Sequence, residues 1–215
     1  MSDALLRACI LAAADSIDAA RDDLCSLDSK AGDGDHGVTM ALAARGVRKQ
    51  LTESPEASAA YLVTRLALAT GSVGGAIGPI YASGLLAVAA TLRGLDSQEG
   101  LRVEDVLSCA EAAEKAVAAL GGARPGDKTI LDALDPAVSS LRSSVSTGAS
   151  MGGALNDAAE AASAGAAATA SMTAALGRAS RLGERSRGTA DPGASSFALI
   201  LRAMASQYFR ATSNS

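Results

Sequence analysis

Three aspartates lie close together in one short, glycine-rich segment of the chain. Asp28, Asp33 and Asp35 fall within eight residues, with glycines between and beside them. Because carboxylates repel one another, three of them in so short a segment indicate a cation between them. Oxygen ligands favour a hard ion, Mg²⁺ or Ca²⁺. An amphipathic helix pattern begins at about residue 36, so the segment predicts a metal, and the phosphates that it bridges, at a helix N-terminus.

Two common metal and phosphate loops do not match this segment. An EF-hand requires a bidentate glutamate at its twelfth position, and counting from Asp28 the twelfth residue is Thr39. A P-loop requires a Gly-Lys-Ser/Thr sequence, and none follows. Asp-Gly-Asp sequences are also common in solvated turns, so a turn without a metal stays open as the alternative.

The composition predicts an all-helical protein. The chain has 215 residues, which suits one domain or at most two small ones. Apolar residues make up 48 %, with only two Phe, three Tyr and no Trp among them. A core of Ala, Leu, Val and Ile favours closely packed helices, because β-sheets prefer branched and aromatic residues. The alanine-rich segment 151–175 fits a helix packed tightly against its neighbours.

Charge and cysteine content argue against several classes of protein. The formal charge is −4 and no basic stretch is interleaved with aromatics, so we expect no nucleic-acid partner. Cys9, Cys25 and Cys109 lack metal-ligand spacing and fit reduced core residues of a cytoplasmic protein. We expect no signal peptide and no membrane span, because no stretch reaches the roughly 18 uncharged apolar residues that a span needs.

Apolar residues recur at intervals of three and four along most of the chain, which predicts eight helices. The expected ranges are residues 5–27, 36–51, 54–71, 79–92, 104–120, 129–146, 151–175 and 195–209. Ser54, followed by Pro55, is expected to cap the third helix. Thr129 and Asp132 have the spacing of an N-cap pair for the sixth. Eight helices with short connections predict an antiparallel up-and-down bundle or barrel.

Four connections fall at the same end of such a barrel if its helices alternate in direction. They cover residues 28–37, 71–79, 121–128 and 177–195, and they are the most glycine-rich and charge-patterned connections of the chain. The other connections, near 52–54, 94–101 and 147–150, look like ordinary turns. The pattern therefore predicts chemistry at one end of a helical barrel.

The connection 177–195 contains four arginines, Arg178, Arg181, Arg185 and Arg187. An arginine cluster that faces a carboxylate–metal site suits a polyphosphate, because the guanidinium fork matches phosphate oxygens. A solvated loop with internal salt bridges is the alternative interpretation.

Three further features carry weaker signals. The glycine-rich segment 74–78 resembles a backbone cradle for a phosphate or a flat ring. Lys128 fits a surface lysine as well as it fits a phosphate contact. His36 is the only histidine, and at a helix start beside metal-binding aspartates we expect it to position or stack rather than to act as a base.

Taken together, four segments of the chain resemble the DhaL family, the nucleotide-binding subunits of dihydroxyacetone kinases. The segments are Asp28–Met40, Gly74–Pro79, Pro125–Thr129 and Gly177–Ala194. They follow one another in the family's order, and the resemblance covers essentially the whole chain. It implies a single DhaL-like domain over residues 1–215, folded as an eight-helix antiparallel up-and-down barrel with its nucleotide site at one end.

The resemblance also implies a role for individual residues. Asp28, Asp33 and Asp35 match the family's metal ligands, where two Mg²⁺ ions bridge the phosphates of ADP or ATP. Arg178 and Asp33 match its catalytic residues, because Arg178 and the metals neutralise charge during phosphoryl transfer. The nucleotide contacts match His36, Gly37, Val38, Thr39, Ala76, Ile77, Gly121, Ile130, Arg178, Asp191, Pro192 and Gly193.

Two places depart from the family pattern. The family commonly has a serine close to the phosphates where this chain has Ile77. Isoleucine cannot donate a hydrogen bond, and the loss of one to a charged group is worth about 1.5–3 kcal/mol. Thr189 and Ala190 replace a His-Gln pair.

The implied function is phosphoryl transfer to a small ketose. In the family, that ketose is bound covalently to a histidine of a separate DhaK-type subunit, so activity requires a hetero-complex. In one branch ADP stays bound and is rephosphorylated by a DhaM-type phosphotransferase-system protein, and in the other ATP exchanges. Both branches stay open here. So do two alternatives: a kinase subunit for another ketose such as a tetrulose, and a non-catalytic module that binds nucleotide or an apolar ligand.

Overall fold

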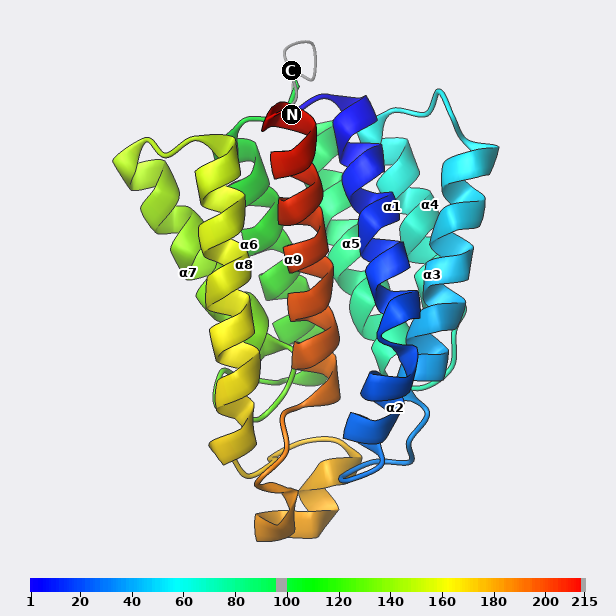
Figure 1. Ribbon diagram of the computed structural model, residues 1–215, viewed down its shortest axis with the longest axis vertical. Coiled ribbons are helices and arrows are strands. Elements are labelled where there is room, and N and C mark those ends of the chain that lie inside the picture. Colours follow the sequence, from blue (N-terminus) through cyan, green and yellow to red (C-terminus); the bar gives the residue numbers. More distant parts are fainter. Residues whose placement is uncertain (96–99, 214–215) are drawn as a thin grey trace.

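The computed structural model describes residues 1–95 and 100–213, and within them the chain is helical with no strand (Figure 1). The α-helices are α1 (Asp3–Ala19), α2 (Arg21–Asp28), α3 (His36–Glu53), α4 (Ala59–Gly71), α5 (Ile77–Arg93), α6 (Val103–Gly121), α7 (Leu131–Thr147), α8 (Met151–Ala168) and α9 (Pro192–Ser213). Two 3₁₀ segments, η1 (Thr169–Ser171) and η2 (Arg178–Ser186), lie between α8 and α9. The predicted all-helical class is confirmed.

The long helices form a closed ring. Each helix from α3 to α8 packs against the next one along the chain, α9 packs against α1, and α1 packs against α3. Their directions alternate, and both ends of the described chain lie at the same end of the ring (Figure 1). This is the up-and-down antiparallel barrel that the sequence predicts, with the short α2 as an addition. None of the helices in the described ranges is long and apolar enough to cross a membrane.

Small side chains allow the helices of one half of the ring to approach closely. Ala154, Ala158 and Ala162 recur every fourth residue on α8 and are fully buried against α7 and α9. At Gly165, a Cβ atom would lie 2.1 Å from the carbonyl oxygen of Asp132 on α7. The alanine-rich tract is therefore the tightly packed helix that its composition predicts.

The first predicted helix is wrong in one respect, because the chain bends at Ala20 and α2 begins at Arg21. The bend brings the backbone of α2 against the start of α3, where a Cβ atom at Gly37 would lie 1.9 Å from the carbonyl oxygen of Arg21. The break thus follows from packing between two helices, which the local sequence does not encode.

Other boundaries also shift. The third predicted helix begins at Ala59, and its cap is Ser58, whose hydroxyl accepts the N–H of Tyr61, rather than Ser54. The fourth begins two residues early, at Ile77, and the seventh ends at Ala168. The eighth begins at Pro192 rather than 195, and the segment before it, expected as a loop, contains η2. Of the expected turn at 94–101, residues 96–99 lie outside the described residues.

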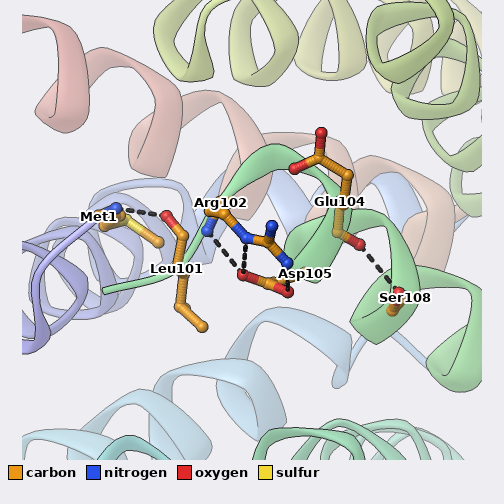
Figure 2. A network of polar contacts seen from close by, with 6 residues as sticks. All are labelled: Met1, Leu101, Arg102, Glu104, Asp105 and Ser108. Carbon is orange, nitrogen blue, oxygen red and sulfur yellow. Dashed lines mark hydrogen bonds and ion pairs between the residues drawn. The ribbon is translucent and has the colours of Figure 1, made fainter. Parts of the chain in front are cut away.

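At the end of the barrel that carries both chain ends, polar contacts join the first residue to the α5–α6 connection (Figure 2). The nitrogen of Met1 donates to the carbonyl of Leu101, and the N–H of Leu101 donates back to Met1 at 2.9 Å. The carboxylate of Asp105 accepts the N–H of Arg102 at 2.8 Å and caps α6. The opposite end carries the four glycine-rich connections.

Candidate functional site

The connections α2–α3, α4–α5, α6–α7 and α8–α9 meet at one end of the barrel, the lower end in Figure 1, and line a common cleft of about 450 Å³. Asp28, Asp33 and Asp35 lie at its edge. All of the expected nucleotide-binding residues except Gly37 and Val38 also line it. They are His36, Thr39, Ala76, Ile77, Gly121, Ile130, Arg178, Asp191, Pro192 and Gly193. The topology therefore gathers segments from the whole length of the chain.

Gly37 and Val38 lie at the start of α3 but do not line the cleft. Gly37 is buried against α2, where it permits the close approach to Arg21. The Val38 side chain is half-exposed on the outside of the barrel. A ligand contact at these two positions would have to come from their backbone N–H groups.

The three aspartates form a compact cluster of carboxylates. Asp28, Asp33 and Asp35 each offer one oxygen, and these oxygens lie within 4.8 Å of one another. Within the described residues, this is the only set of three or more His, Cys, Asp or Glu side chains grouped closely enough to share an ion. An all-oxygen donor set at the open edge of a cleft suits Mg²⁺, which binds one or two carboxylates together with phosphates and water.

Asp28 also organises the loop itself. One of its oxygens, Oδ2, accepts the N–H groups of Gly34, Asp35 and His36 at 2.9, 3.0 and 3.3 Å. Its other oxygen faces Gly32, where a Cβ atom would lie 2.1 Å away. A larger residue at position 32 would have to displace this carboxylate from its three hydrogen bonds. Asp28 thus joins the cluster to the N-terminus of α3.

Arg178 reaches the cluster from the α8–α9 connection, where its guanidinium forms an ion pair with Asp33. Both side chains keep about half of their surface exposed. Arg187 behaves differently, because it donates to the carbonyl of Ser171 at 2.9 Å and pairs with Glu184 inside its own connection. The two interpretations of the arginine-rich segment thus apply to different residues: Arg178 faces the carboxylates, and Arg187 holds the loop.

His36 is buried beneath the cleft. Its Nε2 lies 3.0 Å from the hydroxyl of Ser196 on α9, and that hydroxyl also donates to the carbonyl of Gly193. Burial lowers the pKa of His36, although the nearby Asp28 opposes this shift. The ring is therefore neutral at neutral pH and links α3 to α9, in agreement with the positioning role expected for it.

Asp191 caps α9 from inside the cleft. Its carboxylate accepts the N–H of Ala194 at 2.7 Å, and its own N–H donates to the hydroxyl of Thr169 at 2.7 Å. Burial raises the pKa of Asp191 to about 6. The Asp-Pro-Gly segment that begins here is thus a fixed wall of the cleft.

The sequence singles out two features of the α6–α7 connection, the Thr129–Asp132 pair and Lys128, and the structure bears on both. The two side chains of the predicted N-cap pair do bond the backbone, since Asp132 accepts the N–H of Thr129 at 2.8 Å and Leu131 donates to the Thr129 hydroxyl. The predicted cap position is wrong by one residue, because α7 begins at Leu131 and its N-cap is Ile130. Lys128 is neither exposed nor part of the cleft lining, because it is 4 % exposed and donates to the carbonyls of Thr169 and Thr189. Sequence reasoning missed this role, since both carbonyls come from distant segments.

Ile77 separates the cleft from the inside of the barrel. It lines the cleft, and it also lines an apolar cavity of about 300 Å³ between α1, α3, α4, α5 and α9. The residue before it, Ala76, caps α5 without a side-chain hydrogen bond. The first N–H groups of α5 can therefore serve a ligand in the cleft.

Residues 30–206, which include every cleft-lining residue except Asp28, match the protein family described as DAK2 domain. The chain belongs to the DAK2 domain family. This DAK2 domain is 35 % identical to PEP-dependent dihydroxyacetone kinase 1, ADP-binding subunit DhaL, of Listeria innocua, over 84 % of each chain. It is 32 % identical to the corresponding DhaL subunit of Escherichia coli, over 85 % of its own length and 86 % of that subunit. The DhaL resemblance is confirmed.

The chain also matches about a third of several longer proteins. L-erythrulose kinase of Pectobacterium atrosepticum is 38 % identical over 91 % of this chain, which spans 34 % of that relative. The crystal structure of the dihydroxyacetone kinase of C. freundii matches with a TM-score of 0.74 at 28 % identity, covering 96 % of this chain and 35 % of that one. The structure of that kinase in complex with AMP-PNP and Mg²⁺ matches with a TM-score of 0.72. The chain thus spans about a third of these proteins.

Proposed function

We propose that residues 1–215 act as one domain that binds ADP or ATP with two Mg²⁺ ions, as the phosphoryl-transferring subunit of a dihydroxyacetone kinase. The observation that carries the proposal is the convergence of three carboxylates and Arg178 at the edge of one cleft. The names of the relatives support it, because the DhaL proteins of similar length are called ADP-binding subunits.

Different residues of the cleft would contact different parts of a bound nucleotide. Asp28, Asp33 and Asp35 would hold the Mg²⁺ ions, which supply charge neutralisation at the phosphates when bound. Arg178 would exchange its ion pair with Asp33 for contacts to phosphate oxygens, where its fork of donors fits best. Deeper in the cleft, apolar side chains would cover the base and exclude water. They are Ile80, Val117, Ala123, Ile130 and Leu131.

The ketose requires a second protein. His36 is the only histidine of the chain, and its ring is buried and engaged with Ser196. It is therefore unsuited to holding a ketose covalently. We propose that a separate DhaK-type subunit presents the ketose to the open edge of the cleft, in the cytoplasm. Phosphate would come either from a DhaM-type protein acting on bound ADP or from exchanging ATP.

A second candidate substrate is a tetrulose. This chain is 38 % identical to the L-erythrulose kinase of Pectobacterium atrosepticum, compared with 35 % and 32 % for the two DhaL subunits above. Because the ketose would lie on the partner, the partner would set the choice between a three-carbon and a four-carbon substrate.

Reconstitution tests the proposal. With ATP or with a phosphorylated DhaM-type donor, the chain alone should leave dihydroxyacetone unchanged, and addition of a DhaK-type subunit should produce dihydroxyacetone phosphate. Arg178→Met in the same mixture should lower the rate strongly. Rapid turnover by the chain alone would contradict the need for a partner, and an inactive mixture with both phosphate donors would contradict the kinase function.

A further inference from the structure

Lys128 is a buried lysine whose ammonium group bridges two backbone carbonyls. It lies in the α6–α7 connection, and its Nζ donates to Thr169 at 2.7 Å and to Thr189 at 2.6 Å. A buried ammonium is costly unless hydrogen bonds replace its lost water, and here two of its three donors have such partners. The two carbonyls come from either side of the segment that carries Arg178. We call that segment, residues 170–188, the arginine loop.

Neutral hydrogen bonds also hold the base of the arginine loop. The N–H of Gly188 donates to the carbonyl of Ala170 at 2.8 Å, which brings the two ends of the loop together. The N–H of Ala175 donates to the carbonyl of Asp127 at 3.1 Å, beside Lys128. The α6–α7 connection is thus the platform on which the loop rests, and Lys128 adds a charged contact at each end of the loop.

The backbone conformation at position 128 would suit a glycine better than a lysine, so the contacts of the lysine side chain must account for the lysine there. Its φ is +61°, in the left-handed region that glycine adopts without steric cost, and no other non-glycine residue in the described ranges has a positive φ. A lysine at this position keeps a backbone strain that a glycine would avoid. The two hydrogen bonds from Nζ to backbone carbonyls are the contacts that can offset this strain.

The charge of Lys128 also acts on the wall of the cleft. It lowers the pKa of Asp191, against the burial that raises this pKa to about 6. Burial in turn lowers the pKa of Lys128, and Asp191 opposes that shift. The buried ammonium therefore supports the loop and the capping carboxylate of α9 from outside the cleft.

We propose that Lys128 is a positioning residue that clamps the arginine loop to the α6–α7 connection, so that Arg178 faces the aspartate cluster. The proposal rests on the nucleotide site proposed above. Lys128 acts through Arg178 and does not line the cleft. Loss of the clamp should loosen the loop and remove the contribution of Arg178 to nucleotide binding, while the barrel itself stays folded.

Hydrogen exchange of the intact chain without nucleotide tests the clamp directly. Lys128→Met should raise exchange in peptides from the arginine loop severalfold and leave α3 to α6 unchanged, because the loop is held at its base. Lys49→Met is the matched control, since Lys49 is an exposed lysine on α3 whose one ion pair, with Glu53, is long at 3.8 Å. Equal loop exchange in Lys128→Met and the wild type would overturn the proposal.

A double-mutant cycle measured by calorimetric titration with ADP–Mg²⁺ separates positioning from general destabilisation. Arg178→Met should weaken binding about tenfold to a hundredfold, the range expected for one hydrogen bond to a charged group, and Lys128→Met should weaken it about tenfold. In the Arg178→Met background, Lys128→Met should add less than about twofold. Additive losses would overturn the proposal.

A second variant and a separate readout keep the result interpretable. Lys128→Gln removes the charge and is one atom shorter than lysine, so it should not keep both carbonyl contacts, and it carries both measurements if Lys128→Met does not fold. Wild-type exchange and wild-type affinity in Lys128→Gln would then overturn the clamp. If the wild-type chain itself does not bind ADP–Mg²⁺, the proposed nucleotide function fails, and hydrogen exchange still decides whether Lys128 clamps the loop.

Discussion

Replacement of Ile77 by serine should change stability more than nucleotide affinity. The resemblance to the DhaL family implies a serine at this position near the phosphates, and this chain has an isoleucine that lines both the cleft and the interior cavity. Since Ala76 makes no side-chain cap, the first N–H groups of α5 are available to a phosphate without any help from the residue 77 side chain. Ile77→Ser should therefore alter the affinity for ADP–Mg²⁺ by less than about threefold, which is under 1 kcal/mol.

The same substitution removes apolar contacts. Ile77 packs against the core that contains Met40 and Ala44, and it is partly buried. Full burial of an isoleucine is worth about 2–5 kcal/mol against alanine, so the loss for this partly buried side chain should be about 1–2 kcal/mol. For a chain of this length, that corresponds to a fall in melting temperature of about 2–8 °C.

Calorimetric titration with ADP–Mg²⁺ and thermal melting of the same samples test this reasoning. Ile77→Val is the control, since it trims one methylene without adding a hydroxyl and should cost about 0.5–1.5 kcal/mol at most. If Ile77→Ser bound ADP–Mg²⁺ tenfold more tightly than the wild type, the backbone of α5 would not replace the missing hydroxyl, and the reasoning would be refuted.

Three further predictions concern the cleft and its supports. Arg178→Met should weaken the binding of ADP–Mg²⁺ about tenfold to a hundredfold in calorimetric titration, because its guanidinium faces the aspartate cluster of the proposed phosphate site. Unchanged affinity would show that Arg178 does not contact the nucleotide. Burial raises the pKa of Asp191 to about 6, so its contribution to folding is present below its ordinary value of 3.8 and is lost as the pH rises through 6. Relative to the wild type, Asp191→Asn should thus gain up to about 3 kcal/mol of stability between pH 4 and pH 7 in denaturant titrations, and parallel pH profiles would contradict this. Gly37→Ala should destabilise the chain by about 2–4 kcal/mol, because its Cβ would lie 1.9 Å from the carbonyl oxygen of Arg21. Gly74→Ala, with no atom within 4 Å of the added Cβ, should change stability by less than about 1 kcal/mol in the same unfolding assay, and similar losses in both variants would refute the packing argument.

The spacing of apolar residues and the positions of the glycines are enough to predict most of the fold. Spacings of three and four identify the long helices, and their alternation places the four glycine-rich connections at one end. This prediction succeeds because each helix must bury one face in the ring, which fixes its pattern locally. The aspartate cluster could also be predicted from local sequence, because its three carboxylates lie within eight residues of one another.

The features that could not be predicted depend on contacts between distant segments. The break at Ala20 has no glycine or proline to mark it and follows from the packing of α2 on α3. His36 meets Ser196, 160 residues along the chain. Lys128 is satisfied by carbonyls 41 and 61 residues away. At the start of α4 the cap is Ser58, and the Ser54-Pro55 signal was misleading because two candidate serines lie four residues apart.

The most direct test of the account is whether ADP stabilises the chain only when Mg²⁺ and Asp33 are both present. At a nucleotide concentration a hundred times the dissociation constant, binding should add about 2.7 kcal/mol of stability, which raises the melting temperature by about 5–10 °C. Asp33→Ala should abolish this rise, whereas Asp157→Ala, at an exposed aspartate of α8, should keep it. Asp33 is the better choice than Asp28, because Asp28 also folds the loop through three backbone N–H groups. We predict no rise for the wild type in EDTA. An equal rise in EDTA, or in Asp33→Ala, would contradict the assignment of the carboxylate cluster as the metal and phosphate site.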